Sequence, residues 1–234
     1  MEVGDLARIT ENLSEVGRRV ATAAERSGRA ASEIRLVVVT KTQPLERVRA
    51  ALAAGATEIG ENYVQEAEEK LGALTPPFPT RHLIGHLQRN KAGKAAALFD
   101  LVQSVDSAAL AGALGRRAGE LGRVLDVLLE VNIAREASKF GVSEEEALEV
   151  AGAVAGKPGV RLCGLMGIGP LTGDLAATRA SFRRLRGLFE RLPAENRQVV
   201  SMGMTGDFET AIEEGSTMVR VGTAIFGPRV GPPR

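Results

Sequence analysis

The chain has 234 residues, a length that exceeds an average single domain but suits one α/β barrel. Its 30 Lys and Arg residues balance 29 Asp and Glu residues, so the net charge of +1 provides no overall field to attract nucleic acid or an acidic membrane. The only cysteine, Cys163, cannot form an internal disulfide, and the opening residues MEVGDLARIT lack the features of a secretory signal. We therefore expect a cytoplasmic protein without a membrane-spanning segment, because no apolar run approaches the roughly 18 residues required.

Short β-rich runs alternate with helical segments from Ile34 almost to the C-terminus. An amphipathic helix over residues 5–26 is predicted first, covering the bottom or side of the fold. Helices follow between the strands, such as residues 45–55 and residues 143–156, the latter with Ser143 as its N-cap. Eight strands are predicted, at residues 34–40, 56–61, 81–86, 101–105, 124–132, 161–168, 198–204 and 217–222.

This alternation favours a parallel sheet, and eight βα units without a Gly-rich linker favour closure into a (β/α)8 TIM barrel with an extra N-terminal helix. Residues 1–234 would then form a single domain, and a doubly wound open sheet is the alternative. In a barrel, functional groups collect at the C-terminal ends of the strands. The residues at these ends are therefore the first to consider for a site.

Lys41 directly follows the apolar run VVVT, which would place its amine near the barrel axis in a partly desolvated pocket. Burial favours the neutral form of an amine, and the neutral amine is the form that attacks a carbonyl. A Schiff-base lysine is therefore one interpretation. A solvated lysine at a strand end is the other.

The loops after the last two predicted strands contain Thr205-Gly206 and Gly222-Thr223, each directly before a helical segment. Barrels often bind phosphate with these two loops, where backbone N–H groups, a close-approaching Gly and a Thr hydroxyl act together. Ordinary capping and turn formation would explain either loop alone. Both loops at the expected position favour a phosphate site.

Arg220 lies two residues before Gly222 in the eighth predicted strand, so the period of two places both on the inner side. A buried arginine needs an acceptor, which is either the pyridine nitrogen of a cofactor or a carboxylate such as Glu130 or Asp207. A guanidinium beside the ring stays protonated and donates no proton to it. Such a ring is a weaker electron sink than one paired with Asp or Glu.

Seven segments, in their order and spacing, resemble the YggS/PROSC family of pyridoxal phosphate homeostasis proteins. They are VVVTKTQP (37–44), IGENYVQE (59–66), RHLIGHLQRNK (81–91), SKFGV (138–142), GLMGI (164–168), SMGMTGDFETAI (201–212) and GSTMVRVGTAIFGPR (215–229). This family is similar to the barrel domain of alanine racemases and some ornithine decarboxylases, the fold-type III barrel. Those enzymes carry a second, β-rich domain with a catalytic tyrosine, and the resemblance implies no counterpart of it here.

The resemblance implies pyridoxal 5′-phosphate (PLP) as the cofactor and six residues that hold it: Lys41, Asn62, Thr205, Arg220, Gly222 and Thr223. Within this set, Lys41 would carry the cofactor as an internal aldimine and Arg220 would lie beside the pyridine nitrogen. Asn62 would line the ring pocket, and the other three would surround the phosphate.

Other candidate groups have simpler interpretations. His82 and His86 are four residues apart but lie on a predicted strand without the HExxH glutamate, so no metal site is expected. His82 would pack in or beside the barrel, and His86 would lie at its rim. Lys139 is a transient cofactor acceptor, a second phosphate ligand or a surface-loop lysine. Cys163 is expected to be a small core residue.

Two classes of function remain open. The first is a PLP-binding protein of intracellular PLP homeostasis, which buffers the cofactor or delivers it to apo PLP-dependent enzymes and has no turnover of its own. The alternative is a PLP-dependent racemase or decarboxylase of small amino acids, and a non-binding scaffold is a third possibility. The chain is expected to be a monomer or a weak dimer.

Overall fold

The computed structural model describes residues 3–136, 139–170 and 173–228. Ser138 of the SKFGV segment and Arg229 of the last segment lie outside these ranges. The strands are β1 (Arg35–Val39), β2 (Glu58–Glu61), β3 (Thr80–Leu83), β4 (Leu101–Val105), β5 (Leu125–Val131), β6 (Val160–Gly167), β7 (Val199–Ser201) and β8 (Met218–Val221). The α-helices are α1 (Val3–Arg26), α2 (Leu45–Ala53), α3 (Val64–Gly72), α4 (Ala92–Leu98), α5 (Ala108–Glu120), α6 (Ala147–Ala155), α7 (Leu175–Glu190), α8 (Phe208–Glu213) and α9 (Thr223–Phe226). Short 3-10 turns occur at Ala31–Glu33, Arg89–Lys91 and Ala194–Asn196.

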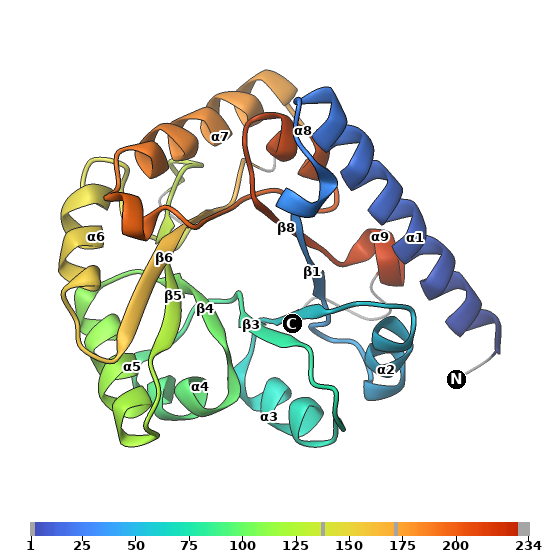
Figure 1. The fold of residues 1–234 in the computed structure, drawn as a ribbon, viewed down its shortest axis with the longest axis horizontal. Helices are drawn as coiled ribbons and strands as arrows, with labels where there is room; N and C mark the ends of the chain where they lie inside the picture. The colour runs from blue at the N-terminus through green and yellow to red at the C-terminus, as the bar shows by residue number, and fades with distance from the viewer. Residues whose placement is uncertain (1–2, 137–138, 171–172, 229–234) are drawn as a thin grey trace.

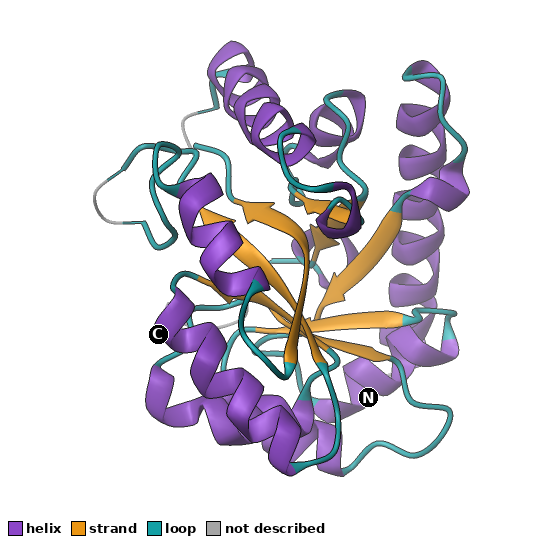
Figure 2. Cartoon of the chain, turned by 60° about the vertical axis from the view of Figure 1, so that its left-hand side comes forward, coloured by secondary structure: helices purple, strands orange, loops and turns teal. Residues whose placement is uncertain are grey.

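The strands form a closed barrel in chain order, with β8 paired in parallel to β1. The strands lie inside and the helices surround them, as Figures 1 and 2 show. The predicted (β/α)8 barrel is therefore confirmed, and the open sheet is wrong. All eight predicted strands are present, although some are shorter than expected. The seventh ends at Ser201 because the chain turns out of the sheet at Gly203, whose φ of 96° is accessible mainly to glycine.

Helix α1 takes a place in the outer ring between α8 and α2 (Figure 1). The helix that follows β8 is only four residues long, so it covers only part of the outer faces of β8 and β1. Ile9, Val16 and Val20 of α1 fill this gap, packing in one cluster with Val219 of β8 and Val38 of β1. The predicted N-terminal helix therefore covers the side of the barrel.

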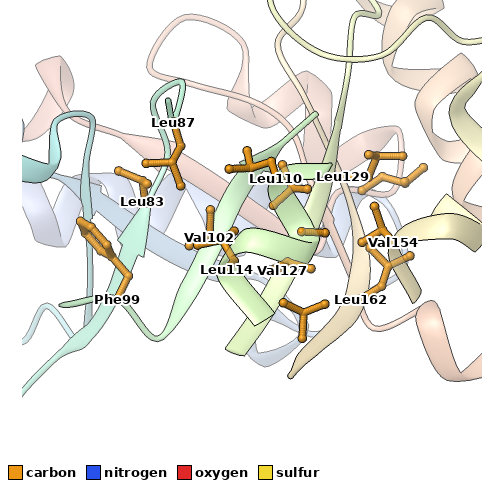
Figure 3. Packing of buried hydrophobic residues seen from close by; sticks show 14 of the residues in the cluster. Leu83, Leu87, Phe99, Val102, Leu110, Leu114, Val127, Leu129, Val154 and Leu162 are labelled. Atoms are coloured by element: carbon orange, nitrogen blue, oxygen red, sulfur yellow. The ribbon is translucent and has the colours of Figure 1, made fainter. Parts of the chain in front are cut away.

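The largest apolar cluster lies between the outer faces of the strands and the helices around them. Figure 3 shows part of it, where Leu110 and Leu114 of α5 pack near Val102 of β4 and Val127 of β5. Such buried side chains supply most of the favourable free energy of folding. The barrel is thus stabilised mainly from outside, and its interior holds a smaller apolar cluster beside buried polar groups.

Helix α6 begins later than predicted. Ser143 does not cap it, because the helix starts at Ala147 and its N-cap position is Glu146. The Ser143 hydroxyl instead accepts a hydrogen bond from the Glu146 N–H, which closes the turn that precedes the helix. The serine therefore stabilises a turn of the kind that Ser often forms locally.

Within the described residues, no helix is long and apolar enough to cross a membrane.

Candidate functional site

A cavity of about 310 Å³ opens at the carboxyl ends of the strands. Val39, Ile84 and Ile168 form apolar parts of its wall. Its wall also includes all six residues expected to bind a cofactor: Lys41, Asn62, Thr205, Arg220, Gly222 and Thr223. The structure thus brings together residues from the first and the last strand ends, which lie far apart in the sequence. The volume lies at the lower end of the roughly 300–1,000 Å³ common for small-molecule sites.

Lys41 lies in a tight turn directly after β1. The Gln43 N–H donates to the Thr40 carbonyl at 3.1 Å, and Thr42 has a φ of 61°, a conformation that costs energy in a residue other than glycine. The Thr42 N–H donates to a carboxylate oxygen of Glu66 on α3. The turn that carries Lys41 is therefore held by contacts from a neighbouring helix.

Lys70 of α3 also holds this turn, through the carbonyl of Thr40. Its ammonium donates to the Thr40 carbonyl at 2.7 Å and lies 2.6 Å from Glu61 Oε1 and 2.8 Å from Glu66 Oε1. The side chains of Lys70 and Glu61 are only 9% and 2% exposed. Burial raises the pKa of the Glu61 carboxyl, and Lys70 and the Thr40 hydroxyl oppose this rise. We call Lys70, Glu61 and Glu66 the turn clamp.

The turn clamp was not predicted from the sequence. A weak signal was present, because Glu66 and Lys70 have the i, i+4 spacing that pairs side chains on one helix face. The third member, Glu61, lies on β2, and no local pattern connects it to α3.

The two predicted phosphate loops contact each other. Thr205 Oγ1, after β7, accepts a hydrogen bond from the Ala224 N–H, after β8, at 3.4 Å. A Cβ added to Gly222 would lie 3.1 Å from Val39 Cβ, whereas one added to Gly206 would meet nothing within 4 Å. The backbone of the β8 loop therefore packs closely against the end of β1, and the β7 loop leaves open space beside it.

Arg220 points into the barrel, as predicted, and is 4% exposed. Its hydrogen bonds go to the Ser201 hydroxyl and, at 3.0 Å, to the Gly167 carbonyl. Burial lowers its pKa to about 10, and the charges of Glu130 and Asp207 oppose this shift. The guanidinium is thus still protonated at neutral pH. Neither carboxylate is a hydrogen-bond partner within the described residues, and both act on Arg220 only through their charge.

Glu130 lies near the end of β5 and faces the same interior as Arg220. It is buried, which raises its pKa from an ordinary value of 4.5 to about 7. The charge of Arg220 limits this rise, and the charge of Asp106 adds to it. Glu130 therefore changes its protonation state near neutral pH, close to the candidate site but outside the cavity wall.

The remaining candidate residues lie away from the cavity. His82 is fully buried inside the barrel, and His86 lies at the rim, where its ring stacks on Phe140 with centroids 3.9 Å apart. Over the described ranges, no group of three His, Cys, Asp or Glu residues could hold a metal ion. The Lys139 amine lies 4.0 Å from a Glu136 carboxylate oxygen, on a partly exposed loop. Cys163 is a buried free thiol, as expected.

Comparison with known proteins agrees with this geometry. The profile described as "alanine racemase, N-terminal domain" matches residues 5–230. A pyridoxal phosphate homeostasis protein of Pseudomonas aeruginosa is 42% identical over 224 residues, which cover 96% of this chain and 97% of that protein. An unknown protein from Bifidobacterium adolescentis has a crystal structure with a TM-score of 0.89 at 39% identity, covering 97% of both chains.

The structure of PipY from Synechococcus elongatus with PLP bound has a TM-score of 0.80 at 38% identity. The match covers 94% of this chain and 100% of PipY. The chain is thus a barrel of the alanine racemase N-terminal domain family. Within this class, it belongs to the family of pyridoxal phosphate homeostasis proteins. The resemblance drawn from the sequence segments is confirmed.

If the turn clamp stabilises the fold, removing the Lys70 ammonium should strongly reduce the stability of the protein. Lys70→Met should lower the free energy of unfolding by about 3–5 kcal/mol, because Glu61 is left buried without its partner. Adding Glu61→Gln to this variant should restore part of the loss. Urea denaturation of the three proteins measures both effects.

Lys94→Met is the matched control for Lys70→Met. Lys94 pairs with Glu68 at 2.6 Å, but both side chains are about half exposed. The free energy of unfolding of Lys94→Met should fall by less than about 1 kcal/mol. Equal losses in Lys70→Met and Lys94→Met would contradict the clamp.

Glu130 predicts a pH dependence of stability. Between its unfolded value of 4.5 and its folded pKa of about 7, the folded state holds a proton that the unfolded state has lost, so stability falls as pH rises. The full loss corresponds to about 3 kcal/mol. Glu130→Gln should therefore gain stability relative to the unmodified protein as pH increases from 4.5 to 8, measured by urea denaturation of the cofactor-free proteins.

A stability difference between Glu130→Gln and the unmodified protein that stays constant from pH 4.5 to 8 would show that the Glu130 carboxyl does not titrate in this range.

Proposed function

We propose that this chain binds PLP covalently through Lys41 and serves PLP homeostasis, by holding the cofactor and releasing it to apo PLP-dependent enzymes. The observation that carries the proposal is the convergence of Lys41, Arg220 and the two Thr-Gly loops on one cavity. The relatives support it, since PipY has PLP bound and the Pseudomonas aeruginosa relative is named for PLP homeostasis.

The cavity fits the parts of the cofactor. Lys41, in the turn after β1, brings an amine to the cavity wall for the aldehyde, and the joined loops offer the Thr205 hydroxyl and backbone N–H groups to a phosphate. Gly206 leaves open space beside them. Asn62, Ile84 and the other wall residues between these ends would face the ring. When bound, PLP supplies an aldehyde that captures amines and a ring that accepts electrons.

The charges of the cavity wall favour holding over turnover. Among the described wall residues, Lys41 and Arg220 are the only ionisable side chains. A protonated guanidinium can donate a hydrogen bond to the ring nitrogen but transfers no proton to it, which keeps the ring a weak electron sink. A racemase would also need a second base at the cavity. The single tyrosine of the chain, Tyr63, is 51% exposed and is not part of the wall.

Covalent binding at Lys41 can be mapped directly. After incubation with PLP and borohydride reduction, the peptide that contains Lys41 should carry a pyridoxyl mass, and Lys41→Ala should carry none there and lose the visible absorbance. Lys94→Ala, at an exposed position of α4, should behave like the unmodified protein. A pyridoxyl mass mainly on another lysine would overturn the assignment.

Delivery and turnover are separable. The loaded protein should restore activity to an apo PLP-dependent enzyme, whereas loaded protein locked by borohydride should not. A panel of amino acids should show no turnover. Turnover on the order of 1 per second or faster, lost in Lys41→Ala, would instead identify a PLP-dependent racemase or decarboxylase.

A further inference from the structure

Buried polar side chains form a continuous chain of contacts across the barrel interior, starting at Arg220. Arg220 Nη1 donates to Ser201 Oγ, and Ser201 Oγ donates to Gln103 Oε1 at 2.7 Å. Gln103 Nε2 lies 3.0 Å from His82 Nδ1. Ser201, Gln103 and His82 are fully buried. We call these four residues the interior chain.

The interior chain ends at the floor of the barrel. His82 Nε2 lies 3.0 Å from Glu58 Oε2, and Glu58 Oε1 accepts a hydrogen bond from Arg35 Nε at 2.8 Å. Glu58 and Arg35 are the first residues of β2 and β1. The contacts therefore connect the wall of the cavity with the amino ends of the strands.

The hydrogen atoms of the interior chain have one consistent direction. A guanidinium only donates hydrogen bonds, so Ser201 Oγ must accept one from Arg220. The Ser201 hydroxyl then donates its own hydrogen bond to Gln103 Oε1. The two amide hydrogens of Gln103 then go to His82 Nδ1 and to Met218 Sδ, which lies 3.1 Å away. A flipped amide would place its oxygen against the Met218 sulfur and leave the Ser201 hydrogen without an acceptor.

The direction fixes the state of His82. Its Nδ1 accepts, so the ring is neutral and carries its hydrogen on Nε2. Nε2 lies 3.0 Å from Glu58 Oε2, a close contact without the alignment of a hydrogen bond. The environment agrees, because burial lowers the pKa of His82 more strongly than Glu58 raises it; the more distant Arg35 adds to the lowering, and Asp100 opposes it. Each hydrogen bond of the interior chain is thus donated in the direction from Arg220 toward His82. The Ser201 hydroxyl oxygen therefore faces the guanidinium as an acceptor.

Packing alone does not require this arrangement. Val37, Leu128, Cys163 and Val199 fill neighbouring interior space with apolar or weakly polar groups. A polar group in such surroundings costs free energy unless each of its atoms has a partner, and loss of one partner exposes the next. The interior chain is therefore coupled from end to end, with Arg220 as its only member in the cavity wall.

We propose that Gln103 and His82 are positioning residues for Arg220: through Ser201 they hold its guanidinium in the orientation that meets the ring of the bound cofactor. The cofactor part of this inference rests on the proposed function, and the Arg220 part does not. Ser201 and the Gly167 carbonyl are the two anchors of the guanidinium. Removing Gln103 frees the Ser201 hydroxyl to turn and weakens one of them.

The first test uses the cofactor-free protein. Nitrogen-15 NMR should show slow rotation of the Arg220 guanidinium in the unmodified chain and fast rotation in Gln103→Leu. Arg220→Gln identifies the signal by its loss. Cys163→Ala, in the same interior cluster but outside the interior chain, should lose some stability and keep slow rotation. Unchanged rotation in Gln103→Leu would overturn the inference.

The second test uses the PLP-loaded protein. In Gln103→Leu, the pyridoxyl mass should remain on Lys41 after borohydride reduction, but the absorption maximum should shift. The dissociation constant should rise about 10-fold, which corresponds in size to one net hydrogen bond. Cys163→Ala should keep both values. An unchanged spectrum and affinity in Gln103→Leu would contradict the proposed role.

These outcomes separate the two proposals. Absence of PLP from Lys41 in the unmodified chain rejects the proposed function, whereas the NMR test still decides whether Gln103 positions Arg220. If Gln103→Leu does not fold, the same measurements can be made on Ser201→Ala, which removes the hydroxyl between Gln103 and Arg220.

Discussion

Only every second residue of a strand points into a closed barrel, and each such residue must fill space or find a polar partner there. At the carboxyl end of this barrel, the constraint brings Val39, Arg220 and Gly222 to one cavity. Gly222 leaves room for close approach of the backbone to β1, and Arg220 brings a charge that needs acceptors. The site and the polar interior below it are therefore consequences of the same alternation.

The two buried cations near the cavity are held in different ways. Lys70 lies next to two carboxylates, so its charge is neutralised directly and its role is to fix a turn. Arg220 donates instead to a hydroxyl and a carbonyl, with carboxylates acting only from a distance. Its positive charge thus remains available to the cavity. This difference suits one cation to structure and the other to recognition of a ligand.

Strand order, barrel closure and the inward direction of Arg220 were predictable, because they follow from hydrophobic alternation along short segments. The contact between Lys70 and Glu61 was not, since it depends on how α3 packs against β2. Gln103 lies within the short run LVQSV, and its partners come from three other strands. Ser143 has the pattern of an N-cap, but the competing turn at this position uses its hydroxyl.

The place of α1 has a consequence for synthesis of the protein. Ile9, Val16 and Val20 leave the ribosome long before their partners Val219 and Phe226. Val38 and Ala51 of the same cluster follow soon after α1, but the rest of its apolar face stays without its native cover until those later partners are made. Barrel closure also requires β8 to pair with β1, a contact between segments far apart in the sequence. The wall around β8 is thus completed by a helix that is made well before it.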